Sequence, residues 1–249
     1  MSVNESEWVK VHYTAKVRKD DNSYQVFETT REPVARAENI FNERATYQPL
    51  LIRAGDEKFL VPGVSKEIVG METNKEKSIE IAPENGFGKR DAKQIETVPV
   101  RSLRKAKINP VQGASVEFRG RRGIISWVGS GRARIDYNHP LAGKTLMYDV
   151  EIQEIITDEK EVANDLIKRR FPPTIKIDDF KIEFVDDPKS LSITMPYYLL
   201  LYEGVAMTLI SIANELENYL KYKKVNFTYE FDFSDKQPPQ ADSDATEEE

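Results

Sequence analysis

Residues 63–71 read Gly-Val-Ser-Lys-Glu-Ile-Val-Gly-Met, a pattern typical of a short amphipathic helix, because its valine and isoleucine side chains can share one face at helical spacing. The next segment, Glu-Lys-Ser-Ile-Glu-Ile at 76–81, alternates polar and apolar residues and predicts a half-buried strand. Asn-Gly-Phe-Gly follows at 85–88, where glycines on both sides of an aromatic residue indicate a turn. This order of helix, strand and aromatic turn decides our interpretation of the fold.

Strand patterns lie on both sides of this stretch. Val-Lys-Val-His-Tyr at 9–13 alternates, and the turn signal Asp-Asp-Asn-Ser at 20–23 precedes a second apolar run at 24–27, which together predict a hairpin. Residues 28–49 have no clean period, so we expect a long loop with a helical turn. Far downstream, Leu-Met-Tyr-Asp-Val-Glu at 146–151 again predicts a strand.

In their order and composition, these segments resemble the FKBP-type peptidyl-prolyl cis-trans isomerases, over roughly residues 7–92 and 137–157. The resemblance implies an α+β fold in which an FKBP-like antiparallel β half-barrel surrounds the short helix. It also implies an enzyme that isomerises X-Pro bonds in unfolded or nascent polypeptides. We therefore expect a proline-binding pocket in this part of the chain.

Isomerisation of an X-Pro bond asks for little covalent chemistry. Amide resonance sets a barrier of about 18–20 kcal/mol, and the twisted amide is less polar than either planar form, so a dry apolar pocket favours the transition state. No acid, base, cofactor or metal is needed. The composition agrees with this expectation, since the chain has no cysteine and only two histidines, which we interpret as a strand surface residue, His12, and a turn residue, His139.

The resemblance implies a pocket built from aromatic and branched side chains. The matching positions of this chain are Tyr13, Phe27, Glu28, Ile52, Leu60, Val61, Val64, Phe87, Leu146 and Tyr148. The backbone N–H of Val61 is expected to donate to a substrate carbonyl. Three positions depart from the family pattern, because Glu28 stands where the family often has Asp, Phe87 replaces a Tyr, and Val64 replaces a Trp.

Residues 93–136 interrupt the resemblance with short β-like runs punctuated by proline and glycine, which predicts a small β module. Its position, with Asn-His-Pro-Leu-Ala-Gly at 138–143, resembles SlyD-type and long archaeal FKBPs, whose insert-in-flap domain holds unfolded polypeptide beside the pocket. The candidates for apolar contact with a bound polypeptide are Leu103, Ile108, Val111, Ile124, Ile125 and Trp127. About half of them are expected to fill the module's own core instead.

Charge is distributed unevenly, since nine lysines and arginines face one carboxylate between positions 101 and 134 of a chain whose net charge is −6. Exposed guanidinium groups attract phosphate, so an RNA- or ribosome-associated binding factor is an alternative function. The basic surface also suits a solvated face that attracts acidic nascent chains. A further alternative is a catalytically weak FKBP-like docking module, in which Phe87 and Glu28 mark a lost activity.

The remaining chain predicts a separate α/β domain over residues 158–233. We expect a capped helix after residue 157, three short strands between 175 and 195, a long helix from Pro196 to about Lys221, and a final strand. The long helix is apolar nearly all round, which favours a homodimer through this domain over an additional client-binding surface. A buried core helix would give the same pattern.

We thus expect an isomerase domain at 1–92 and 137–157, a chaperone insert at 93–136, the C-terminal domain at 158–233, and a disordered acidic tail at 234–249. The start of the sequence lacks the basic and apolar regions of a signal peptide. The most apolar run of the whole chain, residues 197–213, falls short of the roughly 20 residues that a membrane span needs. The sequence therefore predicts a cytoplasmic protein that does not enter a membrane.

Overall fold

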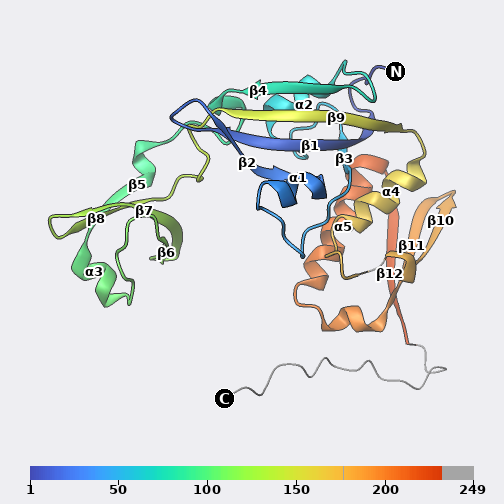
Figure 1. Ribbon diagram of the computed structural model, residues 1–249. Coiled ribbons are helices and arrows are strands. Elements are labelled where there is room, and N and C mark those ends of the chain that lie inside the picture. Colours follow the sequence, from blue (N-terminus) through green and yellow to red (C-terminus); the bar gives the residue numbers. More distant parts are fainter. Residues whose placement is uncertain (176, 232–249) are drawn as a thin grey trace. The chain divides into compact units, whose positions relative to one another are not determined.

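The computed structural model describes residues 1–175 and 177–231 (Figure 1). The chain divides after Thr157 into two compact units. Both mix helices with sheets, and the two sheets of the first unit are antiparallel throughout. No helix in the described ranges is long and apolar enough to cross a membrane.

The larger sheet of the first unit joins the two ends of its sequence. Its strands run in the order β2-β1-β9-β4, and β3 pairs with β1. The strands are β1 (Trp8–Arg18), β2 (Tyr24–Thr29), β3 (Leu50–Arg53), β4 (Glu76–Ile81) and β9 (Leu146–Ile156). In the central pair, which Figure 1 shows side by side, Tyr13 lies opposite Val150 and Ala15 opposite Tyr148. Because side chains alternate between faces, Tyr13 and Tyr148 lie on the same face of the sheet.

Two short helices contact this sheet. The helical turn expected between residues 28 and 49 is α1 (Glu32–Ala37), and α2 (Pro62–Ile68) begins with proline in its first turn. Val64 and Ile68 of α2 are fully buried in the core. Gly63 allows a close approach to β4, since a Cβ at this position would lie only 2.7 Å from Cδ1 of Ile81.

The segment between β4 and β9 has its own sheet and core. After the 3-10 turns η1 (Pro83–Asn85) and η2 (Ala92–Gln94), the strands follow the order β5-β8-β7-β6. These elements are β5 (Ile95–Pro99), α3 (Val100–Lys105), β6 (Ser115–Phe118), β7 (Arg121–Gly129) and β8 (Arg132–Asp136). The core consists of Val98, Leu103, Val116, Phe118, Ile125, Ala133 and Ile135. We call this segment, residues 93–136, the insert.

The second unit contains a three-stranded mixed sheet, in which β11 pairs antiparallel with β10 and parallel with β12. The Asp158 side chain accepts a hydrogen bond from the Lys160 N–H at 3.0 Å and so caps the first helix. The long helix α5 forms the crossover that parallel pairing of β11 and β12 requires. The elements are α4 (Glu159–Lys168), η3 (Ile177–Asp179), β10 (Lys181–Asp186), β11 (Lys189–Pro196), η4 (Tyr197–Leu201), α5 (Val205–Leu220) and β12 (Lys224–Glu230).

Two predictions for this unit were wrong. The long helix starts at Val205 and not at Pro196, because Gly204 adopts a left-handed conformation with φ +80° and separates η4 from α5. The strand expected near residue 175 is a turn, in which the Ile175 N–H donates to the Pro172 carbonyl at 3.0 Å. The last residues of the predicted final strand and the predicted disordered tail lie outside the described residues.

Candidate active site

A cavity of about 360 Å³ opens where β1, β9 and the start of α2 meet. Its lining contains Tyr13, Glu28, Glu57, Lys58, Phe59, Leu60, Val61, Pro62, Phe87 and Tyr148. Six of these residues belong to the predicted pocket, namely Tyr13, Glu28, Leu60, Val61, Phe87 and Tyr148. We call this cavity the aromatic pocket.

Four aromatic rings from separate segments converge at the pocket. Tyr13 of β1 and Tyr148 of β9 have ring centroids 5.9 Å apart. Phe27 of β2 packs edge to face against Phe87 at 6.4 Å and against Tyr148 at 6.5 Å. Phe27 thus supports two lining residues although it does not itself line the cavity. The aromatic rings give the wall its apolar surface, while the tyrosine hydroxyls and the charged side chains of Glu28, Glu57 and Lys58 make the rest of the lining polar.

Three predicted pocket residues lie beneath the cavity instead of lining it. Ile52, Val64 and Leu146 are fully buried in the core under the sheet and α2. Their side chains pack among the other buried residues of the core of the first unit. Leu146 still influences the site, because its Cδ1 lies close to Gly86 in the turn that carries Phe87.

The segment before α2 and the first residue of α2 contribute four lining residues that were not predicted from the sequence: Glu57, Lys58, Phe59 and Pro62. Phe59 also packs edge to face against Trp8, with centroids 5.5 Å apart. Its position next to Leu60 was a usable signal, since a continuous apolar run precedes the helix. No pattern marked the two charged residues, whose place at the cavity depends on how the loop folds.

One hydrogen bond sets the electrostatics inside the pocket. The Tyr13 hydroxyl donates to Oε1 of Glu28 at 2.8 Å. Burial, followed by the neighbouring Glu28 carboxylate, raises the pKa of both Tyr13 and Tyr148 far above the ordinary value for tyrosine. Both phenols therefore stay neutral, and the charge nearest to the ring cluster is that of Glu28.

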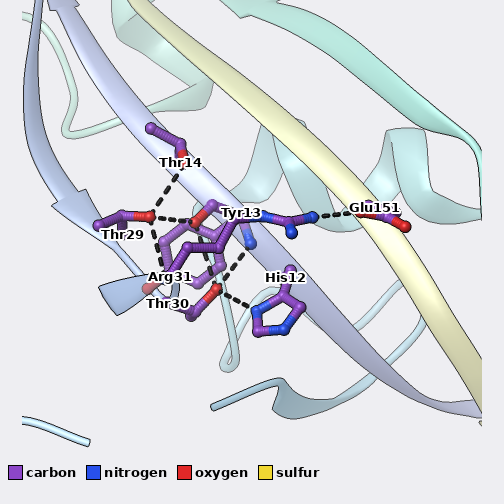
Figure 2. Close-up of polar contacts among 7 residues, drawn as sticks. All are labelled: His12, Tyr13, Thr14, Thr29, Thr30, Arg31 and Glu151. Atoms are coloured by element: carbon purple, nitrogen blue, oxygen red, sulfur yellow. Dashed lines mark hydrogen bonds and ion pairs between the residues drawn. The ribbon is translucent and has the colours of Figure 1, made fainter. Parts of the chain in front are cut away.

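A network of hydroxyl groups holds the backbone of Tyr13 (Figure 2). The Thr30 hydroxyl accepts from the Tyr13 N–H at 2.9 Å, and the Thr29 hydroxyl donates to the Tyr13 carbonyl at 3.0 Å. Thr29 also bonds to the hydroxyl of Thr14, 3.0 Å away. These bonds fix Tyr13 from the end of β2, where the strand ladder stops.

His12 and an ion pair extend the same network. Nδ1 of His12 lies 3.0 Å from the Thr30 hydroxyl, and Arg31 pairs with Glu151 of β9 (Figure 2). Partial burial lowers the pKa of His12, and the positive charge of Arg31 lowers it further, whereas Glu151 opposes the shift. A neutral His12 is therefore favoured beside the pocket.

The second connection between the sheet and the insert lies against the pocket. The Phe87 ring stacks on the His139 ring, with centroids 4.2 Å apart and an angle of 10° between the planes. Nδ1 of His139 accepts a hydrogen bond from the Leu141 N–H at 3.2 Å, as expected for a turn residue. The stacking on a pocket residue was not predicted.

Both connections to the insert are tied to each other. The side-chain amide of Asn138 accepts from the Asp91 N–H and donates to the Asp91 carbonyl, each at 2.9 Å. Burial alone would raise the pKa of Asp136, but hydrogen bonds from Asn138 and the charge of Arg90 outweigh it and keep this pKa below its usual value. The chain therefore enters and leaves the insert through one joined pair of segments.

The predicted client contacts in the insert fall into two groups, which differ in burial. Leu103 and Ile125 are 0% exposed and belong to the insert's core, where about half of the six candidates were expected to lie. Val111 is 53% exposed and Trp127 is 39% exposed. Ile108 and Ile124 are half-buried. In the described part of the chain, no three His, Asp or Glu side chains come together as a metal site would require.

Comparisons with known proteins agree with this arrangement. Residues 96–141 match the family model "FKBP26, IF domain", and residues 159–232 match "FKBP26_C-terminal". A short-type peptidyl-prolyl cis-trans isomerase of Methanocaldococcus jannaschii is 29% identical over 64% of this chain and 98% of its own length. A probable FKBP-type 16 kDa isomerase of Pseudomonas fluorescens is 28% identical over 57% of this chain and 97% of its own. The SlyD isomerase of Helicobacter pylori is 25% identical over 46% of this chain and 63% of its own.

These matches all point to one class of enzymes. Together they support an FKBP-type peptidyl-prolyl cis-trans isomerase. Within that class, the chain combines an insert-in-flap domain with a C-terminal domain of the FKBP26 kind. The resemblance noted in the sequence is thereby confirmed.

Proposed function

We propose that this protein isomerises X-Pro bonds of unfolded or nascent polypeptides in the aromatic pocket. The observation that carries the proposal is the convergence of Tyr13, Phe27, Phe87 and Tyr148 from distant segments on one cavity. We further propose that the β2-β1-β9-β4 sheet with β3 forms a half-barrel around α2. The proline ring binds among the aromatic side chains, where little water can follow it.

The pocket lowers the barrier by its environment. The resonance that resists twisting is worth about 18–20 kcal/mol, and a less polar twisted amide gains relative to the planar forms when water is excluded. Among the described residues, none accepts a hydrogen bond from the Val61 backbone N–H at the start of α2. This donor is free to bind a substrate carbonyl and to orient the peptide across the pocket.

The insert holds the client near the pocket. Val111 and Trp127 offer exposed apolar surface, with Ile108 and Ile124 partly accessible. The joined connections at Asn138 anchor the insert beside Phe87, so a bound polypeptide is kept close to the site. Such tethering raises the effective concentration of proline segments at the pocket without a change in the pocket itself.

The C-terminal domain provides a dimer contact. Residues 197–210 expose several large apolar side chains, including Leu201 at 83% and Met207 at 66%. Soluble chains rarely leave such a cluster uncovered, so a second copy of the chain covers it.

We place the isomerase activity in the cytoplasm, because a chain without cysteine needs no oxidising compartment.

Two assays on two proteins test the proposal. One protein is the full chain, and the other has residues 93–136 replaced by a short loop. A proline tetrapeptide reports the pocket alone, and the refolding of a proline-limited protein reports the pocket together with the insert. We expect both proteins to act similarly on the tetrapeptide, while removal of the insert slows catalysed refolding by about 100-fold, the low end of tethering effects.

Each proposed part can fail separately. A full chain without activity on the tetrapeptide would make this protein a docking module. Equal refolding rates with and without the insert would remove the holding function but leave the isomerase. Far-UV circular dichroism of the shortened protein shows whether its remaining domains are folded.

A further inference from the structure

Besides the aromatic pocket, the first unit has a second cavity, which lies in the insert and is basic. About 820 Å³ in size, it opens between α3 and the turn that joins β7 to β8. Its lining includes four cations, namely Arg101, Arg104, Lys105 and Arg132. Residues 93–136 contain ten lysines and arginines against three carboxylates, in a chain whose totals are 36 and 42. We call this cavity the basic hollow.

The cations of the hollow are not neutralised within the insert, whereas Arg119 and Arg122 nearby pair with carboxylates and Arg121 contacts neutral groups. Arg119 pairs with Glu96 at 3.1 Å, and Arg122 lies 3.8 Å from Glu117. Arg121 donates to Gln94 at 2.6 Å and lies over the Tyr137 ring. In the described ranges, by contrast, no carboxylate lies within 4.0 Å of a side-chain nitrogen of the four hollow cations. Their charge is available to an anionic ligand.

An exposed aromatic ring lies next to the hollow. In the β7–β8 pairing, Trp127 faces Arg134 and Gly129 faces Arg132. Side chains alternate along strands, so these residues share the face opposite to the buried Ala133 and Ile135. The Arg134 guanidinium lies 5.4 Å from the centre of the Trp127 ring. Flat aromatic surface beside several cations is the combination on which nucleobases stack while phosphates are bound.

Gly129 allows the Trp127 ring to lie along strand β7. A Cβ at this position would lie 2.5 Å from the Trp127 ring. The ring therefore covers the backbone immediately before Ser130 and Gly131, which line the hollow. Stacking surface and cationic cavity are thus neighbours on one end of the β7–β8 hairpin.

We propose that the basic hollow and Trp127 together form a binding site for single-stranded nucleic acid. The hollow cations contact successive phosphates, and a base stacks on the Trp127 ring. An acidic polypeptide would satisfy the cations but would have no use for the stacking surface. This site is independent of the proposed isomerase pocket, since none of its residues lines that cavity.

Fluorescence anisotropy of the full chain with a dye-labelled oligouridylate of about 15 nucleotides tests the site. Four phosphate contacts predict that the logarithm of the association constant falls with that of the salt concentration at a slope of about −3. Replacing three cations, as Arg101→Gln, Arg104→Gln and Arg132→Gln together, should reduce the slope to about −1 and weaken binding at least tenfold.

Three arginines of the insert that do not line the hollow provide a matched control. Arg119→Gln, Arg121→Gln and Arg122→Gln remove the same charge from the same insert and should change the affinity by less than threefold. Trp127→Leu should weaken binding about fivefold or more without altering the salt slope, because it removes stacking only. The far-UV circular dichroism spectrum of each variant verifies that the insert is folded.

Three results would overturn the inference. Equal weakening by the two triple variants would mean that the insert attracts anions only through its total charge. A glutamate 15-mer that binds as tightly as the oligouridylate would assign the hollow to acidic polypeptides. Absence of binding at 25 mM salt would leave no nucleic-acid site.

Discussion

The Tyr13 hydroxyl links the aromatic rings of the pocket to Glu28 through a hydrogen bond to its carboxylate. We expect Tyr13→Phe to lower the free energy of unfolding by about 1 kcal/mol, since Glu28 remains accessible to water after its donor is lost. The carboxylate is then free to recruit water to the pocket. A loss of about 1 kcal/mol in the transition state lowers kcat/KM for a proline tetrapeptide about fivefold.

Tyr24→Phe is the matched control for this prediction. Its hydroxyl also donates to a carboxylate, that of Glu80 at 3.2 Å, but on the exposed surface. This variant should change neither the free energy of unfolding by more than about 0.5 kcal/mol nor the tetrapeptide activity. If both variants lose activity equally, the Tyr13–Glu28 bond has no special role in the pocket.

His12 makes stability depend on pH near neutrality. Its pKa is lowered in the folded state, so the unfolded chain takes up the proton first as the pH falls. The stabilisation from neutral His12 is complete above its ordinary pKa of about 6.5 and is lost progressively below that value. The net lowering of the His12 pKa already contains the effects of the neighbouring charges, since Arg31 lowers this pKa and Glu151 raises it.

The measurement compares thermal midpoints of the parent protein and His12→Gln between pH 8 and pH 5. We expect the parent to lose stability more steeply below about pH 6.5 than the variant. Carboxylates titrate in both proteins, so the difference between the two curves isolates the histidine. Parallel curves would show that His12 titrates as it does in the unfolded chain.

Residue patterns predicted which side chains are apolar better than they predicted which way these side chains point. The motif order placed Tyr13, Phe87 and Tyr148 at one cavity, as observed. It could not separate them from Val64 and Leu146, because lining residues and core residues share the same chemistry. The distinction depends on the few ångströms that separate a pocket wall from the layer beneath it.

At the scale of elements, the contact between α2 and β4 positions the pocket. We expect Gly63→Ala to lower the free energy of unfolding by about 1–3 kcal/mol, because the new Cβ would lie 2.7 Å from Cδ1 and 3.0 Å from Cγ2 of Ile81. Ile81 is itself buried and has little room to move. The displaced helix should also shift Val61 and lower tetrapeptide activity.

Glu67→Ala serves as the control on the same helix, since Glu67 is exposed and its partner Lys77 lies at the surface. Its effect should stay within about 0.5 kcal/mol. Urea unfolding followed by Trp8 fluorescence, in a Trp127→Phe background, reports this sheet separately from the insert. Equal stability of Gly63→Ala and its parent would mean that the helix and β4 adapt without cost.

Elements were predicted most accurately where one periodic run coincides with one element. The segments at 76–81 and 146–151 are strands in the structure. The run from Pro196 to Lys221 was misjudged because hydropathy is continuous across Gly204, although the backbone turns there with φ +80°. Parallel pairing of β11 with β12 was not foreseen, because strand partners depend on the crossover between them.

At the scale of the whole molecule, the dimer proposal rests on side chains that lie next to one another in η4 and α5. Met207 is 66% exposed and Ile210 is 53% exposed, one turn apart on α5. Each replacement by glutamate would bury a charge in an apolar contact, which is strongly unfavourable without a partner. We expect light scattering to give twice the mass of one chain for the parent and the mass of one chain for Met207→Glu with Ile210→Glu.

Asn218→Glu adds charge to the same helix at an exposed polar position and should leave the dimer intact. The tetrapeptide activity should be the same in all three proteins, because the aromatic pocket is formed entirely within residues 1–157. A parent that scatters as one chain across a wide concentration range would contradict the dimer. In that case the apolar surface of residues 197–210 would be available to unfolded clients, and the double variant should then lose refolding activity while remaining monomeric.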